Sequence, residues 1–211
     1  IGITGTNGKT TSTSLCGYLF NECGKKSFVA GNIGLAFSEI ATEVKENECV
    51  SLEISSFQLD LIDKFKPRIA MILNITPDHL NRYENSIEKY ALSKLRVFEN
   101  QDSNDYLILN KDSELLNQYF KTAKSNIFFF STTKKVSNGC YLENDELRFL
   151  RNNVVEFSCK ASDIFIKGEH NIQNAMAVII AAKIFNLDNQ KIIEALKSFK
   201  GVEHRLELVR E

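Results

Sequence analysis

Short apolar segments alternate with longer segments of helical spacing along most of the chain, and this alternation constrains the fold more than any other feature. The expected strands are residues 1–4, 26–31, 49–54, 68–76, 105–110 and 126–131. The expected helices between them are residues 9–23, 35–45, 86–100 and 113–123. Such an alternation indicates a parallel sheet with helices on both faces. We therefore predict a doubly wound, mostly parallel α/β fold.

The pattern changes after residue 138. Residues 140–150 and 152–159 have the composition of short antiparallel strands joined by Asn and Asp turns. They predict a small β appendage at about residues 136–166, at the edge of the sheet. Two helices are expected to close the chain, at 170–185 and 189–199. The first is apolar almost all round, so we expect it to be buried.

Composition narrows the class of protein. Hydrophobic residues make up 43% of the 211 residues, which is enough for a sizeable core. Lys and Arg number 26 against 27 Asp and Glu, so charge gives no argument for nucleic acid or an anionic membrane as a partner. No apolar run approaches the roughly 20 residues of a membrane-spanning helix. The five cysteines show no CxxC spacing, which favours reduced thiols in a cytosolic protein over a zinc site.

The segment "ITGTNGKTT", residues 3–11, joins the first expected strand to the first expected helix. A glycine-rich turn in this position lets backbone N–H groups and the helix N-terminus surround an anion. Lys9 could reach terminal phosphates, and the Thr10 hydroxyl could ligate Mg²⁺. The usual G-x-x-x-x-G-K-[ST] spacing is not met, because Ile3 stands five positions before Gly8. We interpret the segment as a variant P-loop-type nucleotide site; the alternative is an ordinary turn.

Polar residues also follow the other early strands. Glu53 lies near the end of the third strand, and Asp78 and His79 follow the fourth. Asn32 follows the second strand, between two glycines. Taken singly, Glu53 could be a solvated strand end and His79 a surface histidine. Because ligands of open α/β sheets bind beyond the carboxyl ends of the strands, we expect these groups to meet there. Glu53 and His79 would then be candidate metal ligands.

Lys94 lies in the middle of the apolar face of the helix predicted at 86–100. A lysine in that position must extend to solvent, pair with an acid, or lose its proton more easily. A lysine with a lowered pKa is a reactive amine that can add CO₂ and become an anionic carbamate. The spacing leaves these alternatives open.

Two amides begin the buried helix near the end of the chain. Asn171 and Asn174 stand three residues apart and share a face, and amides offer the donor and acceptor pair that adenine recognition needs. Helix capping is the alternative for Asn171. Arg205 follows His204 and offers a guanidinium for phosphate.

Seven segments together resemble one family. In order they are "GTNGKTT", "GNIG", "SLEISSFQL", "NITPDHLNRY", "SKLRVFEN", "GEHNIQNAMA" and "GVEHRLE". They are similar to the central ATP-binding domain of the Mur ligases, which build the peptidoglycan stem peptide. The resemblance covers nearly the whole chain except about 111–162. It implies that residues 1–211 form a central domain, between an N-terminal domain for a UDP-sugar and a C-terminal domain for an amino acid, neither of which is in this chain.

The resemblance implies roles for particular residues. ATP binding is implied for Gly5, Thr6, Asn7, Gly8, Lys9, Thr10, Thr11, Asn171, Asn174 and Arg205. Two Mg²⁺ sites are implied, with ligands from Thr10, Glu53, His79 and a carbamylated Lys94. Roles in catalysis are implied for Lys9, His79 and Lys94. Contact with the sugar-nucleotide substrate is implied for Asn32 and Ser55.

The same resemblance implies an ATP-dependent amide-bond ligase that works through an acyl phosphate in the bacterial cytoplasm, as a monomer. The "SSFQL" and "DHLNRY" segments favour members that add D-glutamate to UDP-N-acetylmuramoyl-L-alanine. Two alternatives stay open. One is another Mur-type ligase or a folylpolyglutamate synthetase, and the other is a nucleotide-binding regulatory module without ligase activity.

Overall fold

The computed structural model describes residues 1–202. Its strands are β1 (Gly2–Thr4), β2 (Ser27–Gly31), β3 (Cys49–Glu53), β4 (Ile69–Ile72), β5 (Tyr106–Asn110), β6 (Asn126–Ser131), β7 (Gly139–Glu143), β8 (Glu146–Arg151) and β9 (Val154–Lys160). Its α-helices are α1 (Lys9–Glu22), α2 (Phe37–Ile40), α3 (Ser56–Leu59), α4 (Ile87–Leu95), α5 (Glu114–Tyr119), α6 (Glu169–Ile184) and α7 (Asn189–Ser198). Short 3₁₀ helices are η1 (Leu80–Tyr83), η2 (Arg96–Phe98), η3 (Phe120–Thr122) and η4 (Ala161–Asp163).

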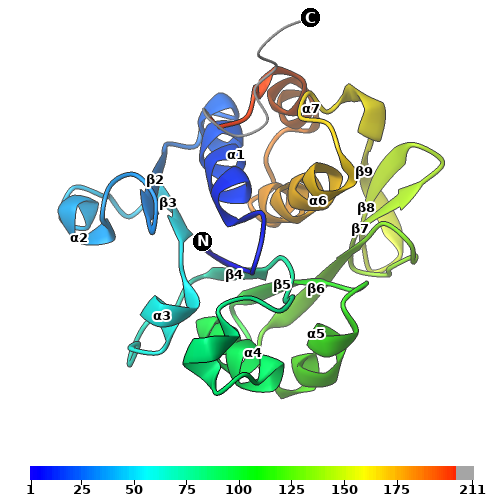
Figure 1. The fold of residues 1–211 in the computed structure, drawn as a ribbon. Helices are drawn as coiled ribbons and strands as arrows, with labels where there is room; N and C mark the ends of the chain where they lie inside the picture. Colours follow the sequence, from blue (N-terminus) through cyan, green and yellow to red (C-terminus); the bar gives the residue numbers. More distant parts are fainter. Residues whose placement is uncertain (203–211) are drawn as a thin grey trace, which may run out of the picture.

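Within these residues the strands form one sheet in the order β2–β3–β1–β4–β5–β6–β7–β8–β9 (Figure 1). Neighbours are parallel from β2 as far as β7, and β7–β8 and β8–β9 are antiparallel. This confirms the predicted doubly wound, mostly parallel α/β fold. The strand order changes direction at β1, which lies between β3 and β4. Ligands of open α/β sheets bind beyond the strand ends at such a point.

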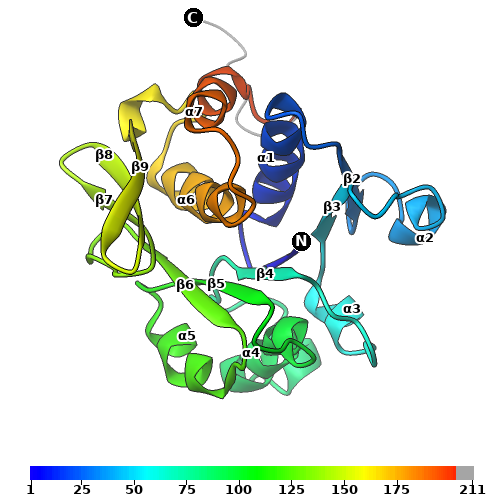
Figure 2. The ribbon, with the colours of Figure 1, turned by 180° about the vertical axis from the view of Figure 1, so that it is seen from behind.

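Helices cover both faces of the sheet, and each layer buries its own apolar cluster. Helices α1, α6 and α7 cover one face, whereas α3, α4 and α5 lie on the other (Figures 1 and 2). The strands between these layers must be apolar on both sides, and all four residues of β4 are buried. Helix α6 is buried along most of its length, as its nearly continuous apolar sequence predicted.

Three predicted helices differ from the observed ones, and one of them, expected at 113–123, is α5 followed by the turn η3. The helix expected at 35–45 is only the single turn α2, which lies beside the edge strand β2 (Figure 1). Leu35 and Phe37 stay exposed there, so little burial stabilises a longer helix. The helix expected at 86–100 is α4 followed by the tighter turn η2. The short helix α3 was not predicted, although Ser55 caps it, as a serine in that position can.

The antiparallel part extends the parallel sheet at its edge instead of forming a separate unit. Its strands occupy 139–160, inside the predicted 136–166. Asn144 and Asp145 join β7 to β8, and Asn152 and Asn153 join β8 to β9. All four have positive φ, from 51° to 65°. Two-residue turns with this backbone match the twist of paired strands, and Asn and Asp tolerate it best.

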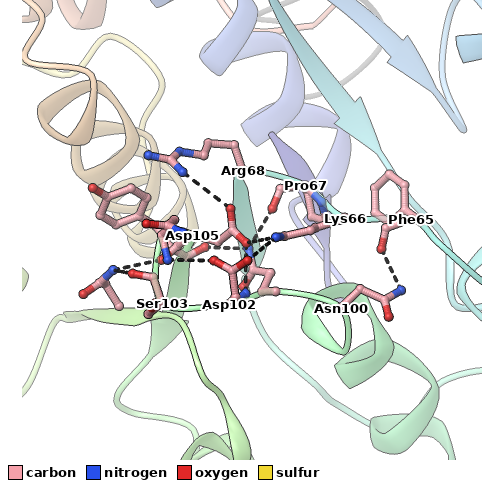
Figure 3. A network of polar contacts seen from close by, with 12 residues as sticks. Phe65, Lys66, Pro67, Arg68, Asn100, Asp102, Ser103 and Asp105 are labelled. Carbon is pink, nitrogen blue, oxygen red and sulfur yellow. Dashed lines mark hydrogen bonds and ion pairs between the residues drawn. The ribbon is translucent and has the colours of Figure 1, made fainter.

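A polar cluster lies at the amino-terminal ends of β4 and β5 (Figure 3). The candidate site lies at the opposite, carboxyl-terminal ends of the strands. Lys66 pairs with Asp102 at 2.5 Å and with Asp105 at 3.2 Å, and Arg68 lies 3.7 Å from Asp105. The Gln101 amide donates to the carbonyls of Pro67 and Tyr106 at 2.9 and 3.0 Å. These contacts join the chain before β4 to the chain before β5, so they stabilise the fold away from the candidate site.

No helix within residues 1–202 is long and apolar enough to cross a membrane. All five cysteines are free thiols, as the spacing predicted, and Cys23 is the only one that is not buried.

Candidate functional site

The glycine-rich segment forms the turn between β1 and α1, as predicted. Gly8 directly precedes α1 and has φ of 82°, a left-handed backbone that favours glycine. A Cβ at Gly8 would lie 2.4 Å from Oδ1 of Asn174. The loop therefore packs tightly against α6. The positive end of the dipole of the 14-residue helix α1 lies at the same loop, where it would stabilise an anion.

Asn74, just after β4, holds the loop from its other side. The backbone N–H of Asn7 donates to Oδ1 of Asn74 at 2.8 Å, and the Asn74 amide donates to the carbonyl of Asn7 at 3.0 Å. The N–H of Thr6 donates to the carbonyl of Asn74 at 3.0 Å. Sequence analysis did not single out Asn74, although it is the first polar residue after the apolar strand, which is the available signal.

Lys9 lies over the loop that precedes it. Its Nζ donates to the carbonyls of Gly5 and Thr6 at 3.0 and 2.8 Å. This places an ammonium group beside the glycine turn, where Lys9 was expected to meet terminal phosphates. Thr13, one turn further along α1, donates its hydroxyl to the carbonyl of Lys9 at 2.8 Å.

Glu53, Thr10 and Asn32 meet at the carboxyl ends of β2 and β3. The Glu53 side chain is only 2% exposed. Thr10 Oγ1 donates to one carboxylate oxygen at 2.9 Å, and Asn32 Nδ2 donates to the other at 3.1 Å. Both donors are neutral, and a buried carboxylate is stabilised far more by a cation. The arrangement therefore fits a divalent cation.

Within residues 1–202 no group of three or more His, Cys, Asp and Glu side chains is placed to hold a metal ion. Mg²⁺ usually takes one or two carboxylates and completes its octahedron with water and substrate phosphates. Glu53 and the Thr10 hydroxyl would supply the few protein ligands that such a Mg²⁺ site needs.

Lys94 is fully buried on α4, so its predicted position on the apolar face is confirmed and extension to solvent is excluded. It is 1% exposed, and its Nζ donates to the carbonyl of Gly5 at 3.0 Å. The ammonium also lies 4.5 Å from the ring centre of Tyr90. Gly5 therefore accepts hydrogen bonds from both Lys9 and Lys94, which brings the two lysines to the same point of the loop.

Burial lowers the pKa of Lys94 from its ordinary value of 10.5 to about 7, and the charge of Lys9 lowers it further, while Asp78 and Asp60 act in the opposite direction. A large fraction of this amine is therefore uncharged near neutral pH.

Replacing Lys94 with methionine should stabilise the chain at pH 6 and lose this advantage by pH 10. Unfolded Lys94 keeps its proton up to about pH 10.5, whereas the folded residue releases it near pH 7. Between these values the unfolded state binds more protons, so this group makes the wild-type free energy of unfolding rise with pH. From pH 6 to pH 10 we expect the difference in the free energy of unfolding between the variant and the wild type to shrink by about 4 kcal/mol.

Urea unfolding of both proteins at pH 6, 8 and 10 measures this difference. Lys89→Met, at an exposed lysine of the same helix, is the matched control and should show little pH dependence. A Lys94→Met difference that is constant with pH would show that Lys94 keeps its proton in the folded chain.

His79 lies at the same edge of the sheet, in the loop after β4, but it is not buried. Its side chain is 59% exposed, and its Nε2 lies 3.6 Å from Asp78 Oδ2. Its ring centre is 5.6 Å from that of Phe57, and its backbone is left-handed, with φ of 49°. Among the described residues, no hydrogen bond or ion pair joins His79 to Glu53 or Lys94.

Of the two late asparagines, Asn174 lies against the glycine loop and Asn171 lies behind it. Asn174 contacts Gly8, and its amide donates to Oδ1 of Asn171 at 3.3 Å. The Asn171 amide donates to the carbonyl of Lys167 at 2.8 Å. Asn171 does not cap the helix, because Gly168 precedes the first residue of α6. Arg205 and His204 lie outside the described residues.

A cavity of about 290 Å³ lies beside Glu53. The two remaining predicted residues, Asn32 and Ser55, do not line it, but each directly follows a residue that does. Its walls are mostly apolar and include Phe37, Leu52 and Ile54. Asn32 directly follows Gly31, which lines this cavity, and points its amide at Glu53. The Ser55 hydroxyl accepts the N–H of Gln58 at 3.3 Å, and this half-buried residue directly precedes α3.

Comparison with known proteins decides the family. The family model described as the Mur ligase middle domain matches residues 3–182. This chain belongs to the Mur ligase middle domain family. The resemblance found in the sequence is thereby confirmed.

Relatives in the Mur ligase family match almost the whole chain. The UDP-N-acetylmuramoylalanine–D-glutamate ligase of Caldanaerobacter subterraneus is 45% identical over 99% of this chain and 45% of its own length. The enzyme of the same name from Clostridioides difficile is 42% identical over 100% of this chain and 46% of its own length. The chain therefore spans about half the length of these relatives.

Solved Mur ligase structures share the fold. A UDP-N-acetylmuramoyl-L-alanyl-D-glutamate–2,6-diaminopimelate ligase superimposes with a TM-score of 0.79 at 22% identity, over 100% of this chain and 48% of that protein. UDP-N-acetylmuramate–alanine ligase from Thermotoga maritima gives 0.66 at 24% identity, over 96% and 45%.

Proposed function

We propose that this chain is the ATP-binding middle domain of a ligase that joins D-glutamate to UDP-N-acetylmuramoyl-L-alanine. One observation supports a nucleotide site most directly. The glycine loop and the buried Glu53 lie at adjacent strand ends, and Glu53 accepts a hydrogen bond from Thr10 of α1. The buried Lys94 reaches the loop from α4 and donates to Gly5. The names of the relatives support D-glutamate as the amino acid.

In this proposal the loop Gly5–Thr11 surrounds the ATP phosphates. The N-terminus of α1 and Lys9 supply positive charge, which is stabilising where phosphate charge shifts during transfer. Asn174 contacts the loop from the α6 side and donates to Asn171. Both asparagines and Arg205 are proposed as further nucleotide contacts. Because phosphoryl transfer depends mainly on position and charge, these groups would act by orienting the nucleotide.

Thr10 and Glu53 would hold Mg²⁺, which screens phosphate charge when bound. Lys94 is proposed to add CO₂: its uncharged nitrogen bonds to the carbon, and a proton leaves to water. The resulting carbamate is an anion where the unmodified lysine is a cation. Together with His79 it would provide ligands for a second Mg²⁺, at the loop after β4.

The proposed reaction has two steps. The carboxylate of the UDP-sugar substrate attacks the γ-phosphorus of ATP, which gives an acyl phosphate and ADP. The amine of D-glutamate then attacks the acyl carbon, the carbon–oxygen bond to phosphate breaks, and the nitrogen releases a proton to water. Asn32 and Ser55 are proposed to contact the UDP-sugar substrate, because each directly follows a residue that lines the cavity next to Glu53. The free thiols fit a reducing cytoplasm.

The full-length enzyme should form product and ADP from ATP, UDP-N-acetylmuramoyl-L-alanine and D-glutamate. An assay of phosphate release and product mass, with a panel of amino acids, tests this. The 211-residue chain alone is the control and should make no product, since it covers about half of its relatives. Preference for another amino acid would replace D-glutamate, and nucleotide hydrolysis that needs no second substrate would favour a regulatory module.

A further inference from the structure

One carboxylate, that of Asp60, connects three segments that lead from the candidate site. Asp60 directly follows α3. Its Oδ2 accepts a hydrogen bond from the Tyr83 hydroxyl, in η1, at 3.0 Å. Its Oδ1 accepts a hydrogen bond from the Ser93 hydroxyl, in α4, at 2.5 Å. Each carboxylate oxygen therefore holds a different element.

Further contacts make this arrangement rigid. Tyr83 and Ser93 are buried, and their hydroxyl oxygens lie 3.3 Å apart. The Ser93 hydroxyl is also 3.0 Å from the carbonyl of Ser56. Arg96 donates to the backbone carbonyls of Asp60 and Ile62, both at 2.7 Å. A fully connected polar network inside a low-dielectric layer favours a single arrangement of the elements it joins.

Each of the three elements is adjacent in sequence to a candidate site residue. Helix α3 begins directly after Ser55, which follows the strand that ends at Glu53. The turn η1 begins directly after His79. Ser93 directly precedes Lys94 on α4. The relative positions of Glu53, His79 and Lys94 therefore depend on how these elements are held together.

The network also reaches the glycine loop. The ring centres of Tyr83 and Tyr90 are 5.3 Å apart. The Tyr90 hydroxyl lies 3.4 Å from Oγ1 of Thr6, and Lys94 sits over the Tyr90 ring. Packing is thus continuous from Asp60 to the loop that is proposed to bind phosphate.

We propose that Asp60 is a positioning residue for the ligase reaction, and that it acts through Tyr83 and Ser93 to hold His79 and Lys94 in place relative to Glu53. This rests on the proposed function, because the reaction gives these three residues their common task. Asp60 itself touches neither the loop nor the Glu53 carboxylate in any described contact.

Three variants of the full-length enzyme test this: Asp60→Asn, Tyr83→Phe and Ser93→Ala. Each should lower kcat by about tenfold, because small displacements of reacting groups have large effects on rate. The KM for ATP should stay within about twofold, since the loop itself is intact. The double variant Tyr83→Phe/Ser93→Ala should lose less than the product of the two single effects, because both hydroxyls act through one carboxylate.

Tyr18→Phe is the matched control. Tyr18 donates its hydroxyl to Ser198 at 2.9 Å, on the opposite face of the sheet, so this variant also loses one tyrosine hydrogen bond. Its kcat should equal that of the parent. A loss of kcat in Tyr18→Phe as large as in Tyr83→Phe would make the effect one of general stability, and would overturn the proposal.

A second measurement does not need ligase activity. The rate at which an amine-reactive reagent labels Lys94, compared with the exposed Lys121, should rise about fivefold in Ser93→Ala and stay unchanged in Tyr18→Phe. Unchanged labelling together with kcat within twofold of the parent would overturn the positioning role. A parent enzyme that forms no product would refute the proposed function alone, and the labelling would still decide whether the network holds Lys94 in place.

Discussion

Lys94→Ala in the full-length enzyme should lower kcat by about a thousandfold, with partial recovery when a short carboxylate such as acetate is added. The reason is the charge that the proposed carbamate supplies. The buried amine is close to the glycine loop and Lys9, and its conversion to a carbamate would place an anion beside the proposed metal. Alanine leaves a space in which a small carboxylate could supply that charge. Initial rates over a range of acetate concentrations measure the recovery.

Lys89→Ala is the matched control for this variant. Lys89 lies on the same helix, exposed, and pairs with Glu84. Its loss should leave kcat unchanged and make the rate independent of acetate. Full activity of Lys94→Ala without acetate would exclude Lys94 from the mechanism.

Gly139→Ala should lower the free energy of unfolding by about 4 kcal/mol, and the melting temperature of the chain by about 10 °C. Gly139 begins β7 with φ of 131°. A Cβ there would lie 1.8 Å from the carbonyl oxygen of Phe129, its partner in β6. The nearest atoms to this Cβ all belong to the backbone of Phe129, which cannot rotate away as a side chain could. β6 and β7 would therefore have to separate, at the point where the antiparallel part joins the parallel sheet. Thermal unfolding followed by circular dichroism measures the effect.

Gly24→Ala separates crowding from backbone strain. Gly24 also has a left-handed backbone, with φ of 82°, but nothing lies within 4 Å of an added Cβ. We expect a loss of only about 1 kcal/mol, from the backbone alone. Equal losses in the two variants would show that the close approach of β6 and β7 is unimportant.

The order of strands and helices could be predicted from the sequence because most elements here are stabilised by their own apolar pattern. β4 and α6 are buried on all sides, and their composition shows it without knowledge of their neighbours. The predictions were wrong for helices whose length or position depends on contacts with neighbouring elements. α2 is short because the edge of the sheet offers little to bury. α3 is held by hydrogen bonds from Ser93 and Arg96 to the carbonyls of Ser56 and Asp60, at its two ends.

The same division applies to the candidate site. Lys9, Glu53 and His79 could be selected from the sequence, because polar residues that follow apolar strands collect at one edge of a parallel sheet. The fully buried state of Lys94 required the fold, since periodicity on one helix cannot show whether another layer covers its apolar face. The partners of each group were also decided by the fold.

By itself, the sequence determined the α/β class, the glycine turn between β1 and α1, and the family, because these depend on local pattern and on the order of short segments. Only the tertiary structure decided that Thr10 and Asn32 hold Glu53, that Gly5 accepts both lysines, and that Asp60 joins three elements. Each of these contacts links residues more than 20 positions apart, apart from that of Lys9 with Gly5. Such contacts form only when separate strands and helices come together around one core.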